Sequence, residues 1–207
     1  MPFGFGRKKE EAAVAQPLPA ADALAPRAVQ FHGFTEEWRL DGAMELTGRL
    51  LDVINHRDAI PVMDVRWAPI DGSAELEPAP GIQSVDPYDL IVLVAGSDTL
   101  APRTEEEQAA HRVHKISFDV ALDAPPFRVV GTVLVHPGAA PETLLERGSQ
   151  MFVAVTDPTV QLDDAFLDLG GANAVLVNRF YLRDVKQVDK LTGAEYVAMP
   201  GVPNGDS

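Results

Sequence analysis

Two stretches decide the expected fold: RLDGAMEL at residues 39–46 and RVVGTVLV at residues 128–135. Each begins with arginine followed by an apolar residue, carries a glycine at its fourth position and ends in an apolar residue. Apolar and polar residues nearly alternate along the first stretch, which is typical of a β-strand with one buried face. Because the two patterns recur 89 positions apart, we expect the second half of the chain to repeat the first.

The residues that follow each stretch support the same repeat. A leucine-rich segment ends at Leu51 in the first half and at Leu145 in the second, and an apolar strand then runs to Asp64 or Asp157. The spacing agrees, because Leu51 and Asp64 are 13 positions apart and Leu145 and Asp157 are 12 apart. We therefore predict that the two leucines are equivalent and that the two aspartates are equivalent. For the aspartates we favour a structural role, in which the short carboxylate accepts backbone N–H bonds in the turn that follows.

Each half reads as strand, strand, short helix, strand, strand, with helices predicted over 47–57 and 141–148. The predicted fold class is mainly β, with two tandem, related small-barrel or sandwich-like units that carry one short helix each. A unit of roughly 70 residues has a marginal core, so the units should pack together with pseudo-two-fold symmetry. The predicted organisation is a disordered Ala- and Pro-rich tail (1–28), unit 1 (29–102), an acidic linker with a short helix (103–111), unit 2 (112–198) and a flexible C-terminus (199–207).

Charge limits the classes of partner. The 207 residues carry a net charge of −14, which repels phosphate backbones and anionic lipids. There is no cysteine, so disulfides and thiolate chemistry are excluded. No apolar run approaches the ~18 residues that span a bilayer, and the N-terminus lacks the order of a secretory signal. We expect a cytoplasmic protein without a membrane span.

Catalytic and metal-binding patterns are weak. The sequence has no G-x-S-x-G elbow and no phosphate-binding loop. Glu107, His111 and His114 would share a helix face, but the histidines lead into a predicted strand and diverge there. The acidic loop at 163–168 lacks the alternating carboxylates of a calcium site. We predict no enzyme activity and no catalytic, cofactor-binding or metal-binding residues.

The second half ends in the motif LVNRFYLRDV at residues 176–185, after a Val-Gly-Thr strand at 130–132 and a threonine-aspartate strand end at 153–157. These motifs resemble a family of uncharacterised bacterial domains and, more loosely, the small Sm-like and SH3-like barrels. The resemblance covers residues 112–189 and implies a small-barrel fold with no assigned chemistry. A helix-like segment between strands and the acidic balance separate this chain from the RNA-binding Sm pattern.

We therefore expect a non-enzymatic bacterial protein that acts as a protein-protein interaction or assembly module, as a homo-oligomer. Contact would be made through exposed strand edges or through a candidate interaction surface in which arginines flank aromatic side chains: Arg179, Phe180, Tyr181 and Arg183. One alternative is a small-molecule-sensing barrel, which requires a pocket between the repeats. A further alternative is an Sm-like nucleic-acid-binding protein, which requires a basic stripe despite the net charge.

Overall fold

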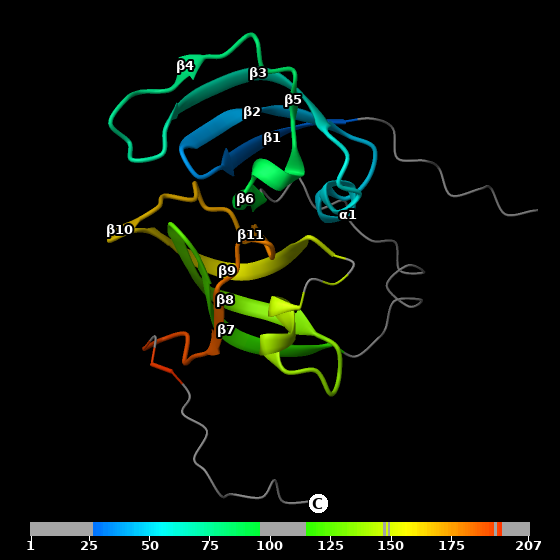
Figure 1. The fold of residues 1–207 in the computed structure, drawn as a ribbon, viewed down its shortest axis with the longest axis vertical. Coiled ribbons are helices and arrows are strands. Elements are labelled where there is room, and N and C mark those ends of the chain that lie inside the picture. Colours follow the sequence, from blue (N-terminus) through cyan, green and yellow to red (C-terminus); the bar gives the residue numbers. More distant parts are fainter. Residues whose placement is uncertain (1–26, 96–114, 147, 149, 193, 196–207) are drawn as a thin grey trace, which may run out of the picture.

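The computed structural model describes residues 27–95, 115–146, 148, 150–192 and 194–195 (Figure 1). Within these residues the chain is mainly β, as predicted, with one α-helix and two short 3-10 helices. The elements are β1 (Arg27–Phe34), β2 (Trp38–Leu46), α1 (Leu50–Asn55), β3 (Ile60–Pro69), β4 (Glu77–Pro78), β5 (Ser84–Val85), η1 (Pro87–Asp89), β6 (Val92–Ala95), β7 (Ile116–Ala124), β8 (Phe127–Val135), η3 (Pro141–Leu145), β9 (Phe152–Leu162), β10 (Ala165–Phe166), β11 (Ala174–Asn178) and β12 (Asp184–Gln187).

The strands form one antiparallel sheet of twelve strands. Its path runs β12-β7-β8-β9-β11-β6-β1-β2-β3-β4, with β10 paired to β9 and β5 paired to β3. In Figure 1, β1 to β4 form the upper part, β7 to β9 form the lower part, and β6 and β11 lie between them. The two halves are therefore joined edge to edge through the β6–β11 pair, in which Leu93 faces Leu176.

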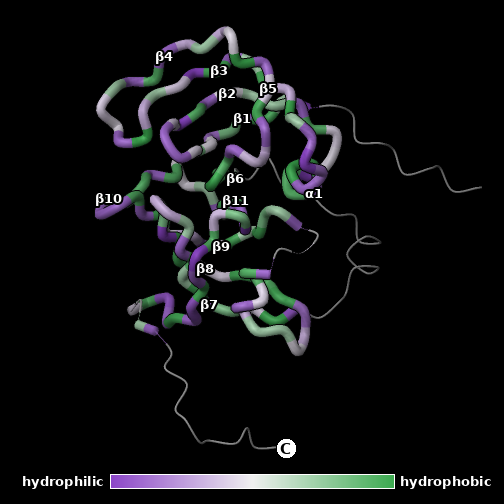
Figure 2. The backbone as a smooth tube through the Cα atoms, viewed as in Figure 1, coloured by the Kyte–Doolittle hydropathy of each residue, from purple (hydrophilic) through white to green (hydrophobic). Residues whose placement is uncertain are grey.

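The central strands supply two hydrophobic cores at once. Every residue of β6 and β11 is buried, and alternate side chains point to opposite faces. On β6, Leu93 packs into a core with β1, β2, β3 and α1, whereas its neighbour Val92 packs into a core with β7, β8 and β9. Strands buried on both faces are continuously apolar, and β6 is coloured hydrophobic in Figure 2. The two cores are thus built on a shared pair of strands.

The two halves connect to these central strands differently. β6 pairs with β1, the first strand of its own half, whereas β11 pairs with β9, the third strand of the second half. Contacts also cross between the halves away from the central strands. The rings of Phe34 on β1 and Phe127 on β8 meet edge to face, with centroids 5.5 Å apart. The expected small units are consequently fused into one sheet.

The helices are shorter than predicted. α1 covers only six residues of the predicted 47–57, and Arg49 stands at its N-cap without a side-chain cap bond. The segment predicted as a helix over 141–148 is the 3-10 helix η3, which ends at Leu145. The motif at 176–185 spans the end of β11, hydrogen-bonded turns over residues 178–182 and the start of β12 at Asp184.

Some predicted segments lie outside the described residues. These include the 103–111 linker with its helix, the 199–207 terminus and residues 1–26 of the predicted tail. At the tail's end the prediction was wrong by two residues, because β1 begins at Arg27 and pairs there with Leu46. No helix among the described residues is both long enough and apolar enough to cross a membrane.

Both ends of the sheet path carry features that discourage further strand pairing. At one end, β4 has two residues and contains Pro78, which has no N–H to donate. At the other end, the Asp184 carboxylate accepts the Val185 N–H at 2.9 Å on β12. Lys186 on the same strand binds Glu195 at 2.7 Å. Short edge strands, prolines and charges are the usual protections of natural sheets, so the strand edges are poor candidates for a recruiting surface.

Candidate functional site

Asp64 and Asp157 occupy matching backbone irregularities. Both have positive φ, 52° and 46°, which is uncommon for a residue other than glycine. The structure corrects the prediction that they end their strands, because Asp64 lies inside β3 and Asp157 inside β9. The pairing register shifts beside each of them, which is the mark of a β-bulge.

Each bulge faces a glycine on the neighbouring strand. A Cβ on Gly42 would lie 3.0 Å from the Met63 carbonyl oxygen. A Cβ on Gly131 would lie 2.8 Å from the Thr156 carbonyl oxygen. In both cases the obstructing carbonyl belongs to the residue just before the bulged aspartate. Glycine is therefore required at the fourth position of both opening stretches because the bulged strand approaches the backbone too closely for a side chain.

The two aspartate side chains differ in their surroundings. The Asp157 carboxylate binds Lys190 Nζ at 3.1 Å. Next to it, the Thr132 hydroxyl donates to Asp119 at 2.6 Å. The Asp64 carboxylate has no hydrogen bond or ion pair with another described residue. Neither carboxylate accepts a backbone N–H within the described part of the chain. The structural role predicted for these carboxylates is therefore not observed, and the bulges form without hydrogen bonds from them to the backbone.

The leucines predicted to be equivalent are both at the margins of the cores. Leu51 on α1 is partly buried against the first core, and Leu145 at the end of η3 is 38% exposed. The preceding residues, Leu50 and Leu144, are the buried ones. Within each leucine pair the first residue is therefore the buried one, and the equivalence of Leu51 and Leu145 stays a prediction.

Arg179 of the predicted interaction surface is partly buried against η3. Its guanidinium donates to the carbonyl oxygens of Leu144 at 2.8 Å and Thr143 at 2.9 Å, and also to that of Glu146. Burial lowers the pKa of Arg179, and the Glu146 carboxylate partly opposes this shift. These bonds satisfy the carbonyls at the end of η3, so Arg179 holds the 3-10 helix in place.

Phe180 and Tyr181 belong to a stack of aromatic and basic side chains from both halves. The rings of Phe180 and Tyr88 lie parallel, with centroids 5.8 Å apart and 5° between their planes. The Arg57 guanidinium carbon lies 5.7 Å from the Phe180 ring centroid. The Tyr181 hydroxyl donates to the Tyr88 carbonyl oxygen at 3.2 Å. We call Arg57, Tyr88, Phe180 and Tyr181 the aromatic shelf.

The shelf lies in a negative field. Burial raises the pKa of Tyr181, and the carboxylates of Glu36 and Asp89 raise it further. Tyr88 is 44% exposed, so the shelf reaches the surface beside these acids. Arg183, the remaining residue of the predicted surface, is exposed at the approach to β12, where its backbone N–H donates to Asp123 at 2.8 Å. Tyr88 and Arg57 were missed from the sequence because they lie about 90 and 120 positions before the predicted motif.

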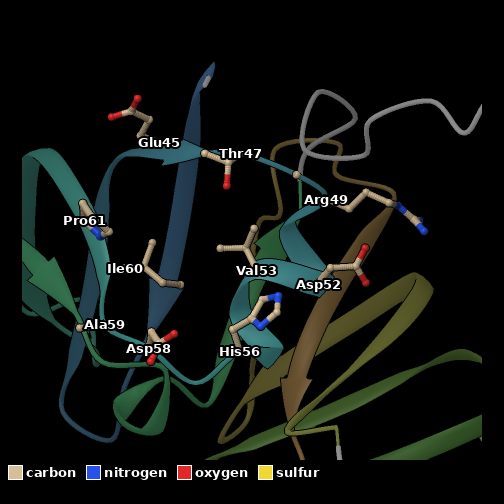
Figure 3. Close-up of a pocket in the computed structure, with 11 residues that line it drawn as sticks. Glu45, Thr47, Arg49, Asp52, Val53, His56, Asp58, Ala59, Ile60 and Pro61 are labelled. Atoms are coloured by element: carbon tan, nitrogen blue, oxygen red, sulfur yellow. The ribbon is translucent and has the colours of Figure 1, made fainter. Parts of the chain in front are cut away.

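A cleft of about 480 Å³ lies in the first half, between α1, the end of β2 and the start of β3 (Figure 3). The cleft lies within one half, whereas the small-molecule-sensing alternative requires a pocket between the two repeats. Its lining mixes apolar and charged side chains: Glu45, Thr47, Gly48, Arg49, Asp52, Val53, His56, Asp58, Ala59, Ile60 and Pro61.

The described residues contain no group of three or more His, Asp or Glu side chains that could hold a metal ion. Glu107, His111 and His114 lie outside that part of the chain. In the acidic loop at 163–168, the Asp168 carboxylate accepts the Gly170 N–H at 2.9 Å and so forms part of a turn. Comparison with protein-family models, curated proteins and solved structures gives no match for this chain.

Proposed function

We propose that this chain is a non-enzymatic protein-binding module whose aromatic shelf receives a basic side chain of a partner protein. The observation that carries the proposal is the parallel stacking of Phe180 on Tyr88, with the Arg57 guanidinium 5.7 Å from the Phe180 ring centroid, because Tyr88 is 44% exposed. Phe180 lies against one face of the Tyr88 ring. A guanidinium or ammonium group of a partner would continue the stack on the other side.

The chemistry of the shelf favours a cation. A cation over an aromatic ring gains about 0.5–1 kcal/mol at an exposed site. The neighbouring carboxylates of Glu36 and Asp89 add a negative field, and the whole chain carries −14. This charge favours a basic partner over a second copy of the chain, since two copies would repel each other. It also weighs against nucleic acid as a ligand.

Preorganisation supports a recognition role. The Tyr88 ring is stacked on Phe180, and the Tyr181 hydroxyl holds the Tyr88 backbone carbonyl, so part of the freedom of this residue is lost before binding. Aromatic residues fixed in this way are typical anchors of protein interfaces. The protections at both ends of the sheet make the shelf a better candidate than the strand edges.

We also infer that the two halves descend from one duplicated unit. The support is the matched pair of bulges: in each, a glycine opposes the carbonyl that precedes an aspartate of positive φ. The order of strands and helices along the two halves agrees with this origin as far as the third strand of each. The different connections of β6 and β11 would then have arisen when the two copies fused into one sheet.

The proposed recognition is tested by NMR titration of the full chain with the peptide acetyl-Gly-Arg-Gly-amide. The matched probe replaces arginine with citrulline, which has nearly the same shape without the charge. We expect shifts at Tyr88 and Phe180 with the arginine peptide, weaker shifts with citrulline, and loss of the response in Tyr88→Ala. Phe166→Ala, which removes another exposed aromatic ring on β10, should leave the response unchanged.

Two outcomes would overturn this function. The first is a response that Tyr88→Ala leaves intact, which would mean diffuse attraction to an acidic surface. The second is an equal response to citrulline, which would mean that charge is irrelevant. The homo-oligomer that the sequence predicts is a separate question, and light scattering at several concentrations measures it. An oligomer that survives in Tyr88→Ala would place self-contact elsewhere on the molecule.

A further inference from the structure

The cleft beside α1 has an apolar interior. Val53 on α1 and Ile60 on β3 face into it from opposite sides, and the Thr47 hydroxyl points toward the same space (Figure 3). Ile60 is buried at its base, with 3% of its surface exposed. Gly48 leaves room at one wall, because a Cβ added there would meet only Val53, at 3.8 Å. The interior can therefore take up an apolar group without moving the backbone.

The rim of the cleft is predominantly anionic. Glu45, Asp52 and Asp58 contribute three carboxylates, whereas Arg49 contributes the one guanidinium among the lining residues. None of the three carboxylates makes a hydrogen bond or ion pair with another described residue. Among the described residues, a cation at this rim would therefore compete with no ion pair or hydrogen bond of these carboxylates. The imidazole of His56 adds a further polar group on the α1 side.

We propose that this cleft binds a small free organic cation in which a short alkyl chain carries an ammonium group. The volume of about 480 Å³ lies within the range of about 300–1,000 Å³ that is usual for ligand sites. In Figure 3 the Asp58 side chain lies beside this interior, whereas the Glu45 and Asp52 side chains point away from it. The interior therefore fits an alkyl chain that leads out to a positive charge near Asp58. An anion would be repelled by the excess of carboxylates at the rim, and a neutral alcohol would gain nothing from them.

The site is independent of the aromatic shelf. The two share no residue, although His56 lines the cleft and Arg57, the next residue in the chain, belongs to the shelf. A failure of the cleft proposal would therefore leave the protein-binding proposal untouched, and the reverse also holds.

The first experiment titrates the full chain with n-butylammonium, 1,4-diaminobutane, butyrate and n-butanol, and follows the backbone amides by NMR. We expect saturable shifts at Gly48, Val53 and His56 with the two amines, and at least about tenfold weaker responses with butyrate and butanol. Equal binding of butanol and butylammonium would overturn the assignment of a cation. The absence of any saturable shift with the amines would overturn the site.

Two pairs of variants locate the binding. Gly48→Leu should fill the cleft and weaken amine binding by about tenfold or more, whereas Gly81→Leu, at a glycine with open space around it, should not change it. Asp58→Asn should weaken binding about threefold, whereas Asp164→Asn, on an exposed turn of the second half, should have no effect. If Gly48→Leu fails to fold, the aspartate pair still decides: equal loss in Asp58→Asn and Asp164→Asn would show unspecific attraction and overturn the proposal.

Discussion

The two bulges share a backbone design and differ in what surrounds it. In the first half, Gly42 makes room for the strand that bends at Asp64, and the aspartate side chain has no described partner. In the second half, Gly131 serves Asp157 in the same way, but Lys190 reaches across to the carboxylate at 3.1 Å. The close approach of two backbones therefore requires glycine at both bulges, whereas the side chains around the two bulges differ.

The second bulge is also the more tightly packed of the two. A Cβ on Gly131 would stand 2.6 Å from Val155 Cγ1, and a Cβ on Gly42 would stand 2.9 Å from Phe31 Cε1. Both neighbours are fully buried, so neither can move aside at low cost. The two halves should therefore respond unequally to the same substitution.

The largest expected effect comes from replacing these glycines with alanine. We expect Gly131→Ala to lower the free energy of unfolding by about 3 kcal/mol and Gly42→Ala by about 1–2 kcal/mol, because overpacking forces backbone shifts. Chemical denaturation followed by circular dichroism measures both. Gly81→Ala, where nothing lies within 4 Å of the added carbon, is the control. Equal losses at Gly42 and Gly131 would contradict the unequal packing.

The next effect concerns two asparagines, one in each half, whose side chains each hydrogen-bond the backbone of the other half. Asn178 of the second half is fully buried; its amide donates to the Leu90 carbonyl at 2.8 Å and its oxygen accepts the Phe180 N–H at 3.0 Å. Asn55 of the first half is partly buried, and its amide oxygen accepts the Phe152 N–H at 2.8 Å. Each therefore satisfies backbone groups that would otherwise lose their partners.

Substitution by alanine should destabilise the protein more at Asn178 than at Asn55. We expect Asn178→Ala to cost about 2–3 kcal/mol of unfolding free energy, since it leaves buried backbone groups without partners, and Asn55→Ala to cost about 1 kcal/mol. The same denaturation experiment applies, with the exposed Asn173→Ala as control. An equal loss of unfolding free energy in Asn55→Ala and Asn178→Ala would show that both sites are equally shielded from water.

A smaller effect of opposite sign is expected at the bulged aspartates. Asp64→Gly should raise the unfolding free energy by about 0.5–1 kcal/mol, because glycine adopts positive φ without the strain of a side chain. Asp157→Gly should raise the unfolding free energy by less, since it also removes the contact with Lys190. Asp64→Ala should instead destabilise the protein. A loss of stability in Asp64→Gly would mean that the carboxylate has a partner or role of its own.

The sequence predicted the strands of both halves but not how those strands pair. The alternation around Gly42 and Gly131 predicted strands correctly, because burial of one face is a local signal. The spacing from leucine to aspartate also marked matching positions. The bulges were not foreseen, because an aspartate within a strand reads the same as one at its end. The pairing of β6 with β11 was also not predicted, because an apolar run indicates burial but not which strand pairs with it.

The candidate sites depended still more on distant contacts. The motif around Phe180 was recognisable as arginines flanking aromatics, but its stacking partner Tyr88 comes from the other half. Arg179 could not be told from a surface arginine, because the carbonyls that it binds belong to η3. The cleft combines residues from β2, α1 and β3, and its lining has no motif of its own. Such sites follow from the fold and not from any one stretch of residues.

The smallest expected effect tests whether the second bulge needs its extra ion pair. Lys190→Ala removes the contact with Asp157 and makes the second bulge resemble the first. Because the Asp157 side chain is 74% exposed, we expect a loss of at most about 0.5 kcal/mol, and a smaller one at high salt, where the pair is screened. Denaturation midpoints at low and high ionic strength measure this difference. A large loss that salt does not reduce would mean that Lys190 acts by packing its aliphatic stem on the sheet, and the contrast between the two bulges would then extend from charge to burial.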